Sequence, residues 1–452
     1  MGTGARRAAR SFWLGAAALV MGVCAAHAEV RYHLTNLGQS FYVADVNASG
    51  VVVGDRSFYG GHMACCWDRF TGLTDLGYLP GGDSWSEATG INDSGLIVGN
   101  SNGGNGAFVW EESLGMMSLP TLNGEPGADA NAISHSAYIV GASGSDNGWR
   151  ACRWNQDGSM VDLGDLPGGS SYSVASDVNE RGLAVGYSSI ETGRHAFLYD
   201  PSYSHPDAPT CHLRDLGDFD GGDDQSRAHG INDLDHVCGG GTISTGGRAF
   251  LWAEATGMRD LGDLPGGAPW SAAFGVNNWD QVVGLSYVGV DLPHAFLWEP
   301  RLGMQDLNDL IDPASGWTLK TAEAINNQGM IVGRGHGPGS VNDQAYLLTP
   351  VELEEMPGDI NGDDRIDLFD AFLFNAAWGT QAGDSLFNRR CDLNFDGRIS
   401  IFDAFQFNQH WVDSAQAPTA VPEPATAILL TGGLFALAAR RRVPTQRRRA
   451  GG

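Results

Sequence analysis

The sequence predicts a mainly β protein in which seven β-propeller blades close into a ring, followed by a small α-helical module. Three observations lead to this prediction. Glycine makes up 64 of the 452 residues, about twice its usual share of roughly 7%. Three short phrases recur along residues 29–350 at intervals of about 45 residues, the size of one propeller blade. An acidic segment that begins at Gly358 is then repeated at Cys391.

The N-terminus has the pattern of an export signal. Arg6, Arg7 and Arg10 precede the apolar run FWLGAAALVMGV, and Ala26-His27-Ala28 forms a small-x-small cleavage site. Residues 1–28 are therefore predicted to be a signal peptide, with a buried N-terminal helix as the alternative. The six cysteines that remain after cleavage are few and irregularly spaced, so we expect neither a disulfide framework nor a zinc site.

The repeat is defined by three phrases. The first is INDSGLIVG at Ile91, and its copies end at Gly54, Gly99, Gly141, Gly186, Gly239, Gly284 and Gly333. The second is HAFLW at His294, and the third is RDLG at Arg259. Short apolar runs between Gly, Asn, Asp and Pro are strand signals, and four such strands fit one blade.

The two ends of the repeat region complete one another. The region opens with RYHLTNLG, which lacks a preceding HAFLW strand, and it closes with QAYLLTP, which lacks a successor. Pairing these orphan strands would close the ring and remove its exposed edges. An open β-solenoid is the alternative. The phrases resemble the HAF repeats of bacterial extracellular proteins, through the His-Ala-Phe at His195 and His294.

The repeated residues favour structure over catalysis, and we predict no catalytic residue. The HAF histidine is replaced in the other copies by Met63, Gly106, Arg150, Arg248 and Gln344, so we interpret it as a strand-edge residue. The Asn-Asp pairs precede turns, where their side chains accept backbone N–H bonds. Trp67, Trp110, Trp154, Trp252 and Trp298 share one strand register and are expected to pack between blades.

The doubled segment has the ligand spacing of a calcium loop, with oxygen donors at positions 1, 3, 5, 7, 9 and 12. We therefore predict two Ca²⁺ sites. The first takes Asp359, Asn361, Asp363, the Arg365 carbonyl, Asp367 and Asp370; the second takes Asp392, Asn394, Asp396, the Arg398 carbonyl, Ser400 and Asp403. Ile366 and Ile399, at position 8, are expected to point inward between the paired loops.

Each loop is followed by one helix and preceded by none, which resembles the type I dockerin domain over residues 357–412. The resemblance implies calcium-dependent docking to a cohesin-like module. Asp364 replaces the position-6 glycine of the first loop, so we expect the second site to bind calcium more tightly. Leu368-Phe369 and Ile401-Phe402 stand where cellulosomal dockerins place Ser or Thr, which argues against a cellulosomal cohesin. The two helices share Phe369 with Phe402, Phe372 with Phe405 and Phe374 with Phe407, and spacings of three place several of these aromatics on one helical face, which we expect to form the shared core.

The C-terminal segment, residues 421–452, resembles the PEP-CTERM sorting signal. It joins a Pro-Glu-Pro motif, an uncharged stretch at 425–439 and two arginine triplets. The resemblance implies processing by an exosortase in a Gram-negative-type bacterium, with residues 425–439 in the membrane beforehand. A plain tail anchor is the alternative. Residues 351–356 and 413–420 read as linkers.

The charge excludes one class of partner. Nine of the 27 basic residues lie in the terminal segments, so 53 acidic residues face only 18 basic ones between Glu29 and Pro424. Such a surface repels nucleic acid. We therefore expect a non-enzymatic binding or scaffold protein on the outer surface, envelope or extracellular matrix, with extracellular polysaccharide among its candidate partners. The alternative is a dockerin-bearing carbohydrate-active enzyme.

Overall fold

In this computed structural model the chain forms two units, and the boundary between them lies between Val351 and Glu352. The structure describes residues 31–125, 127–145, 148–267, 269–289, 292–340, 342–351, 368–381, 391–393 and 398–407. The first unit is built of β-strands and the second contains short helices.

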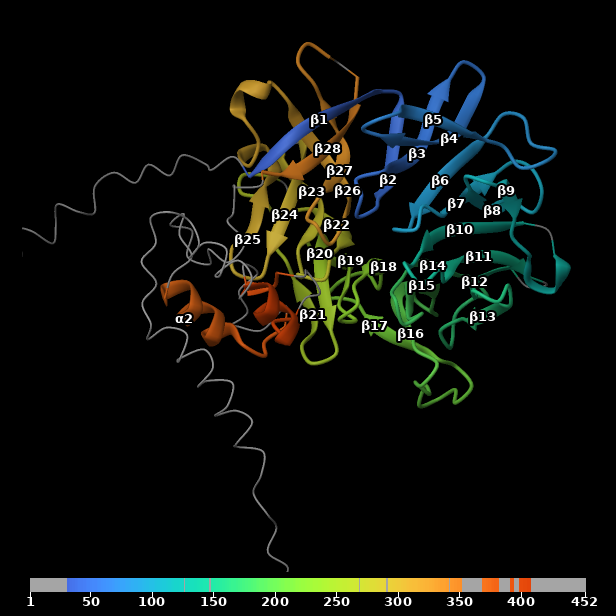
Figure 1. The fold of residues 1–452 in the computed structure, drawn as a ribbon. Helices are drawn as coiled ribbons and strands as arrows, with labels where there is room; N and C mark the ends of the chain where they lie inside the picture. Colours follow the sequence, from blue (N-terminus) through green and yellow to red (C-terminus); the bar gives the residue numbers. More distant parts are fainter. Residues whose placement is uncertain are drawn as a thin grey trace, which may run out of the picture. The chain divides into compact units, whose positions relative to one another are not determined.

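The first unit is a ring of seven four-stranded antiparallel sheets, as predicted (Figure 1). Blade 1 contains β2 (Phe41–Val46), β3 (Val52–Phe58), β4 (Gly61–Asp68) and β5 (Gly72–Gly77); blade 2 contains β6 (Ser86–Ile91), β7 (Ile97–Ser101), β8 (Ala107–Glu111) and β9 (Gly115–Ser118). Blade 3 contains β10 (Ala128–Ile133), β11 (Ile139–Ser145), β12 (Gly148–Trp154) and β13 (Met160–Gly164); blade 4 contains β14 (Ser173–Val178), β15 (Ala184–Ser189), β16 (Arg194–Tyr199) and β17 (Leu213–Gly217).

The remaining blades follow the same order. Blade 5 contains β18 (Arg227–Ile231), β19 (Val237–Ile243), β20 (Gly246–Ala253) and β21 (Gly257–Asp260); blade 6 contains β22 (Ser271–Val276), β23 (Val282–Gly289), β24 (Leu292–Glu299) and β25 (Gly303–Asp306). Blade 7 contains β26 (Thr318–Ile325), β27 (Ile331–His336), β28 (Gln344–Pro350) and β1 (Tyr32–Gln39). Short 3₁₀ turns η1 (Leu122–Gly124), η2 (Leu307–Asp309) and η3 (Pro313–Ser315) lie in the loops. The first strand of each blade contacts its counterparts in the neighbouring blades and is therefore innermost.

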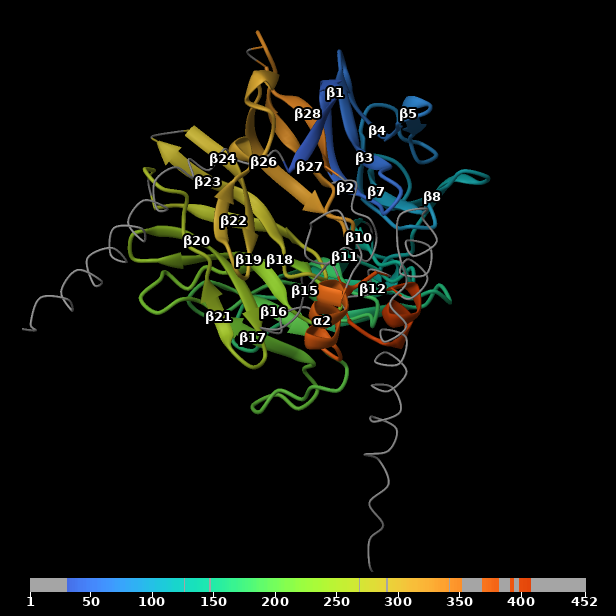
Figure 2. The ribbon, with the colours of Figure 1, turned by 60° about the vertical axis from the view of Figure 1, so that its left-hand side comes forward.

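The ring closes where the chain begins and ends its repeats. Strand β1 pairs antiparallel with β28, from Tyr32 opposite Pro350 to Gln39 opposite Gln344. In the figures the blue β1 lies beside the orange β28 (Figures 1 and 2). The Val351 N–H extends the pairing by donating to the Arg31 carbonyl at 2.8 Å. The predicted closure is confirmed, and the open solenoid is wrong.

The repeated glycine of the IVG phrase has a steric cause. In every blade the register of the innermost strand shifts by one residue, which is a β-bulge opposite that glycine. A Cβ on Gly54 would lie 1.9 Å from the Tyr42 carbonyl oxygen, and one on Gly186 would lie 2.0 Å from that of Val174. Any side chain at this position would therefore clash with backbone.

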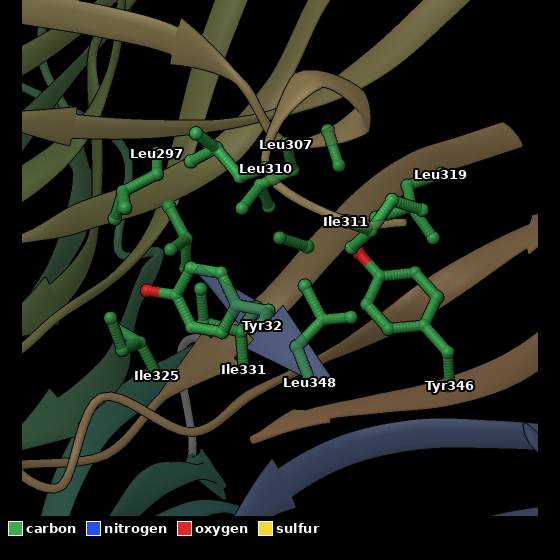
Figure 3. Packing of buried hydrophobic residues seen from close by; sticks show 13 residues of the cluster. Tyr32, Leu297, Leu307, Leu310, Ile311, Leu319, Ile325, Ile331, Tyr346 and Leu348 are labelled. Atoms are coloured by element: carbon green, nitrogen blue, oxygen red, sulfur yellow. The ribbon is translucent and has the colours of Figure 1, made fainter. Parts of the chain in front are cut away.

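The hydrophobic core lies between neighbouring blades. One cluster joins Leu297 of blade 6 to Leu319, Leu348 and Tyr346 of blade 7 and to Tyr32 of the closing strand (Figure 3). The repeated tryptophans pack between blades as predicted, since Trp154, Trp252 and Trp298 are buried in three such clusters. Each buried large side chain contributes about 1.5–3 kcal/mol.

The HAF histidine makes a specific cross-strand pair with the aspartate of the RDLG phrase. His195 Nδ1 lies 2.9 Å from Asp215, and His294 Nδ1 lies 2.5 Å from Asp306. Blades 3 and 5 keep the aspartate and replace the histidine by arginine, which pairs Arg150 with Asp162 and Arg248 with Asp260, whereas blade 7 replaces both members, by Gln344 and Asn36. The position therefore links the two outer strands of a blade.

The repeated asparagines form a belt around the ring. Each side-chain oxygen accepts two backbone N–H bonds within its own turn, as predicted, and each amide also donates to a carbonyl of the next blade, which was not predicted. The cross-blade bonds run from Asn47 to Asn92, Asn92 to Ser134, Asn179 to Asn232, Asn232 to Asn277, Asn277 to Asn326 and Asn326 to Asn47. Ser134 has no amide, so the belt is interrupted after blade 3.

Two aspartates strengthen the same belt. Asp45 accepts the Ile91 N–H of blade 2, and Asp177 accepts the Ile231 N–H of blade 5 at 2.8 Å. Desolvation raises the pKa of Asp45 to about 6 and that of Asp177 to about 7. The ionised form of each carboxyl is therefore disfavoured in the folded ring.

The second unit contains α2 (Leu368–Ala377) and a helical turn at residues 401–407. Phe374 stacks on Phe407 with ring centroids 4.9 Å apart, and Ala377, Cys391 and Ile399 complete the core. The expectation that several of the repeated aromatics form the core holds for Phe374 and Phe407, whereas Phe402 is 68% and Phe405 is 65% exposed. In the described part of the chain no helix is long and apolar enough to cross a membrane. The predicted membrane segment at 425–439 lies outside the described residues.

The belt predicts that Asn232→Asp destabilises the propeller although it preserves the turn. The aspartate keeps the oxygen but loses the amide that donates to the Asn277 carbonyl at 2.9 Å, and we expect a loss of roughly 2 kcal/mol in denaturant unfolding. Asn327→Asp is the matched control, since the Asn327 oxygen accepts the Asn278 N–H and should continue to do so. Equal losses in the two variants would contradict the belt.

The raised pKa of Asp177 predicts a pH-dependent stability. Because the unfolded carboxyl ionises near its ordinary 3.8 and the folded one near 7, this group favours the folded state at low pH and loses that advantage as pH rises to about 7. Between pH 5 and pH 8 the stability of the native protein relative to Asp177→Asn should fall by roughly 3 kcal/mol. The exposed Asp220→Asn should show no such trend. A difference that grows with pH would show that Asp177 is held ionised.

Candidate functional site

The seven blades differ near the start of their innermost strands, at the end of the ring opposite the turns that carry the asparagine belt, and this end is called the mouth below. Each innermost strand pairs one such residue with a residue of the second strand, while the third strand repeats an alanine beside them. The pairs are Tyr42 and Asp55, Glu87 and Asn100, Asp129 and Ala142, Val174 and Tyr187, Arg227 and Gly240, Ala272 and Leu285, and Thr321 and Arg334. Because the fold does not require one residue type here, this mouth is the part of the ring free to carry function.

Blades 1–3 contribute an acidic arc to this mouth. Asp55 Oδ2 lies 2.7 Å from His62 Nδ1, and Glu87 accepts a bond from the Asn100 amide at 3.2 Å. Burial raises the pKa of Asp55, Glu87 and Asp129, and the neighbouring carboxylates raise that of Glu87 further. A carboxylate that orients an imidazole beside acids of raised pKa can transfer protons.

Blades 4 and 5 contribute an aromatic and basic arc. The Tyr172 and Tyr187 rings lie 6.2 Å apart, with the Arg194 and Arg227 guanidinium groups stacked against them. Trp270 of the next blade is 38% exposed and meets Tyr287 edge-on. This side of the mouth can bind a ligand by stacking and by charge-assisted hydrogen bonds.

Two hollows lie away from this mouth. One, of about 180 Å³, is lined by the turns that follow the innermost strands of all seven blades, and the asparagines of six of these turns are used in the belt. The other, of about 470 Å³, lies between blades 4 and 5 beside Trp252. Its charged residues already pair with one another, as in Arg181 with Asp235 and Arg214 with Glu254. Side chains that line both hollows are therefore already engaged in contacts within the propeller.

The second calcium loop is described in part. Asp392 and Asp403, at positions 1 and 12, are 1% and 0% exposed. Asp403 accepts the N–H groups of Leu393 at 2.9 Å and Ser400 at 2.7 Å, so the loop curls around this carboxylate. Buried carboxylates require compensation, and a loop of carboxylate, carbonyl and hydroxyl oxygens is the donor set that calcium prefers. The residues present therefore fit a calcium ion.

Most of the predicted calcium ligands lie outside the described residues. Asp359, Asn361, Asp363, Arg365, Asp367, Asn394 and Asp396 lie outside the described residues, and the side chain of Asp370 is not described. The second loop joins Ser400 to Asp403 through a side-chain hydrogen bond, and Asp392 is buried next to Leu393, whose N–H donates to Asp403. Arg398 forms a β-bridge with Gln381. Among the described residues no three His, Cys, Asp or Glu side chains are grouped to hold a metal.

Ile399 is buried, but its described backbone partners follow the first helix. Its N–H donates to the Thr380 carbonyl at 2.9 Å, and its carbonyl accepts the Gly379 N–H at 3.0 Å. Ile366 lies outside the described residues, so the predicted contact between the two isoleucines stays a prediction. The six described cysteines carry no disulfide.

Sequence reasoning missed the mouth of the propeller. It searched for residues that recur, and Asp55, His62, Glu87, Tyr187 and Arg227 occur once each at positions where the other copies differ. Aligning the seven copies and selecting their variable columns would have found them. The repeated phrases mark the framework, and the departures from them mark the candidate site.

Comparison with known families identifies the two C-terminal segments. Residues 357–410 match the dockerin type I domain, and residues 420–442 match the PEP-CTERM protein-sorting motif. Both predicted resemblances are confirmed, so the chain carries a dockerin domain and an exosortase-type sorting motif, as expected of an exported, envelope-associated protein. Type I dockerin domains bind calcium; the number of sites here stays a prediction, as does the HAF naming of the repeats.

The comparison with solved structures returns propellers at low similarity. The virginiamycin B lyase from Staphylococcus aureus is 13% identical, with a TM-score of 0.41, over 70% of this chain and 99% of that chain. The β-propeller domain of the Trilobed protease from Pyrococcus furiosus is 15% identical, with a TM-score of 0.41, over 61% and 83%. TolB from Acinetobacter baumannii is 10% identical, with a TM-score of 0.38, over 71% and 97%. No curated protein matches the chain.

The calcium loops predict that a chelator unfolds the second unit selectively. Without a cation the buried Asp392 and Asp403 carboxylates repel one another, so the helical circular-dichroism signal should fall while the β signal of the propeller persists. Isothermal titration should show a larger loss of calcium affinity for Asp392→Ala than for Asp359→Ala, with Asp220→Ala as the control. The reverse order would contradict the prediction that the second site is stronger.

Proposed function

We propose that this protein is a non-enzymatic binding and scaffold protein of the bacterial cell envelope. Its propeller presents a ligand-binding mouth, its dockerin domain docks to a cohesin-like module when calcium is bound, and an exosortase processes its tail. Before processing, residues 425–439 hold the chain in the membrane. Extracellular polysaccharide is the proposed ligand of the mouth.

The observation that carries the docking step is an exposed apolar face on the second unit. Ile401, Phe402 and Phe405 are 55%, 68% and 65% exposed on one short helical turn that begins within the loop that Asp403 organises. Exposed aromatic residues on a small module are typical of binding surfaces. Ile401 and Phe402 occupy the loop positions at which the dockerin family reads its cohesin, so the proposed partner offers an apolar surface where a cellulosomal cohesin meets Ser or Thr.

Calcium couples to docking through the shape of this face. Asp403 accepts the Ser400 N–H, and the Ser400 hydroxyl accepts the Phe402 N–H at 3.3 Å, so the calcium loop and the start of the apolar turn share hydrogen bonds. Loss of the ion would free the loop, and Ile401, Phe402 and Phe405 would no longer share one fixed face. Docking is therefore expected only with calcium.

One observation favours a second function. The acidic arc places the Asp55 and His62 pair near Glu87 and Asp129, which are residue types that a carbohydrate-active enzyme uses for proton transfer. Turnover of any polysaccharide in a panel, abolished by Glu87→Gln or His62→Gln with binding retained, would replace the scaffold proposal with this one. Binding without turnover would favour the scaffold.

The docking proposal predicts that Phe402→Ser together with Phe405→Ser abolishes calcium-dependent capture of the partner. The native protein should capture a partner from envelope extracts with calcium and release it with chelator. The double variant should lose capture at least tenfold while it retains calcium binding, since neither side chain supplies a metal ligand.

Phe70→Ser is the matched control, because Phe70 is an 80% exposed phenylalanine of the propeller. It should capture as the native protein does. Capture that survives in the double variant, or that persists in chelator, would contradict the proposal.

A further inference from the structure

We propose that the mouth of the propeller contains, on blades 4 and 5, a subsite for the carboxylate of an acidic sugar. Arg194 and Arg227 would bind the carboxylate, and Tyr172 and Tyr187 would support the sugar ring. This inference deepens the proposed function, on which it rests, by naming a ligand class and the residues that recognise it.

The four side chains form one compact cluster. The guanidinium carbons of Arg227 and Arg194 lie 4.9 and 5.7 Å from the centroid of the Tyr187 ring. Arg194 also lies 5.4 Å from the centroid of Tyr172. The backbone holds Arg194 in place, because its N–H donates to the Asp224 carbonyl at 2.9 Å and its carbonyl accepts the Ser226 N–H. Two cations from neighbouring blades therefore converge on one tyrosine.

Arg194 and Arg227 differ from most arginines of the propeller in that they have no carboxylate partner among the described residues. Arg150, Arg248 and Arg334 each lie within salt-bridge distance of a carboxylate. Within the described residues, Arg194 and Arg227 have no such partner and make no side-chain hydrogen bond. In a protein of net charge −26 a carboxylate partner would be easy to supply. The pair is therefore available to an anion from outside.

Stacking prepares the arginines for this role. A guanidinium group that lies against an aromatic ring uses its face and leaves its N–H edge free, and that edge matches a carboxylate through two parallel hydrogen bonds. The ring also restricts the side chain, which lowers the entropy lost on binding. Arg227 is exposed, and Tyr172, Tyr187 and Arg194 keep part of their surface accessible.

The rest of the mouth indicates what the carboxylate is attached to. Tyrosine suits a sugar, which presents C–H groups to the ring and hydroxyls to the phenolic oxygen. The acidic arc at Asp55, Glu87 and Asp129 faces the mouth from blades 1–3 and would repel a ligand that is anionic throughout. The ligand that fits is an oligosaccharide with a uronic acid residue over the arginines and neutral residues toward the acidic arc.

The test uses the full mature protein and three probes. The first is an oligosaccharide with one glucuronic acid residue among neutral residues, the second is the same molecule with its carboxyl reduced to an alcohol, and the third is a glutamate-rich peptide. By isothermal titration at low salt the native protein should bind the acidic oligosaccharide about tenfold more tightly than the reduced one, as expected for a charge-assisted pair. It should bind the peptide weakly.

Arg194→Gln and Arg227→Gln should each remove most of that tenfold preference. Arg259→Gln is the matched control, because Arg259 also stacks on an aromatic ring, 5.0 Å from the centroid of Trp298, but on an outer strand. It should keep the preference. Tyr187→Phe retains the ring and should change affinity by less than the arginine variants.

Several results would overturn the inference. They are no binding by the native protein, equal binding of the acidic and reduced oligosaccharides, equal losses in Arg259→Gln and Arg227→Gln, or stronger binding of the peptide than of the sugar. Calcium-dependent capture of the docking partner is measured on the same preparations. If capture persists while the sugar preference is absent, the subsite is wrong and the docking proposal stands.

Discussion

The fold depends on the pairing of β1 with β28. Seven blades built from one repeat would leave two sheet edges open, and this single antiparallel pairing removes them. It also fixes both ends of the ring, since Arg31 bonds to Val351 through the backbone and to Glu299 of blade 6 through a 2.8 Å ion pair. The chain therefore enters and leaves the propeller at the same blade. Any force transmitted from a tethered C-terminus would act first on this pairing.

Because the ring is closed by repeated framework residues, other positions of the blades are free to serve recognition. The asparagine belt joins blade 7 to blade 1, because Asn326 donates to the Asn47 carbonyl at 2.8 Å, so this interface has the same bond as every other except that between blades 3 and 4. With the framework fixed by glycine, asparagine, alanine and tryptophan at repeated positions, the paired positions at the mouth are free to differ. Acidic residues gather there on blades 1–3 and arginines with tyrosines on blades 4 and 5, and the resulting asymmetry is what a symmetric ring needs to orient one ligand.

The sequence was sufficient for the architecture because the architecture is periodic. The orphan strands at Tyr32 and Gln344 predicted closure, and the spacing of the IVG glycines predicted the number of blades. It was not sufficient for two features that depend on packing between elements. The donor role of Asn232 requires the position of the next blade, and the outward direction of Phe402 and Phe405 requires the orientation of a helical turn only seven residues long against α2. Repetition shows that an aromatic residue is required, but it does not show which surface it meets.

We expect the two units to differ in their need for calcium, and this difference bears on the order in which they form. The propeller is held by blade-to-blade hydrogen bonds and buried side chains, whereas the second unit has Asp392 and Asp403 buried beside a core of few apolar residues. So small a core needs a bound ion to fold. Extracellular calcium modules bind at about 10⁻⁴–10⁻³ M, a concentration found outside the cell and not in the cytosol. A docking module of this kind would fold, and expose its apolar face, only after export, which keeps Ile401, Phe402 and Phe405 from presenting a formed docking surface before the partner is within reach.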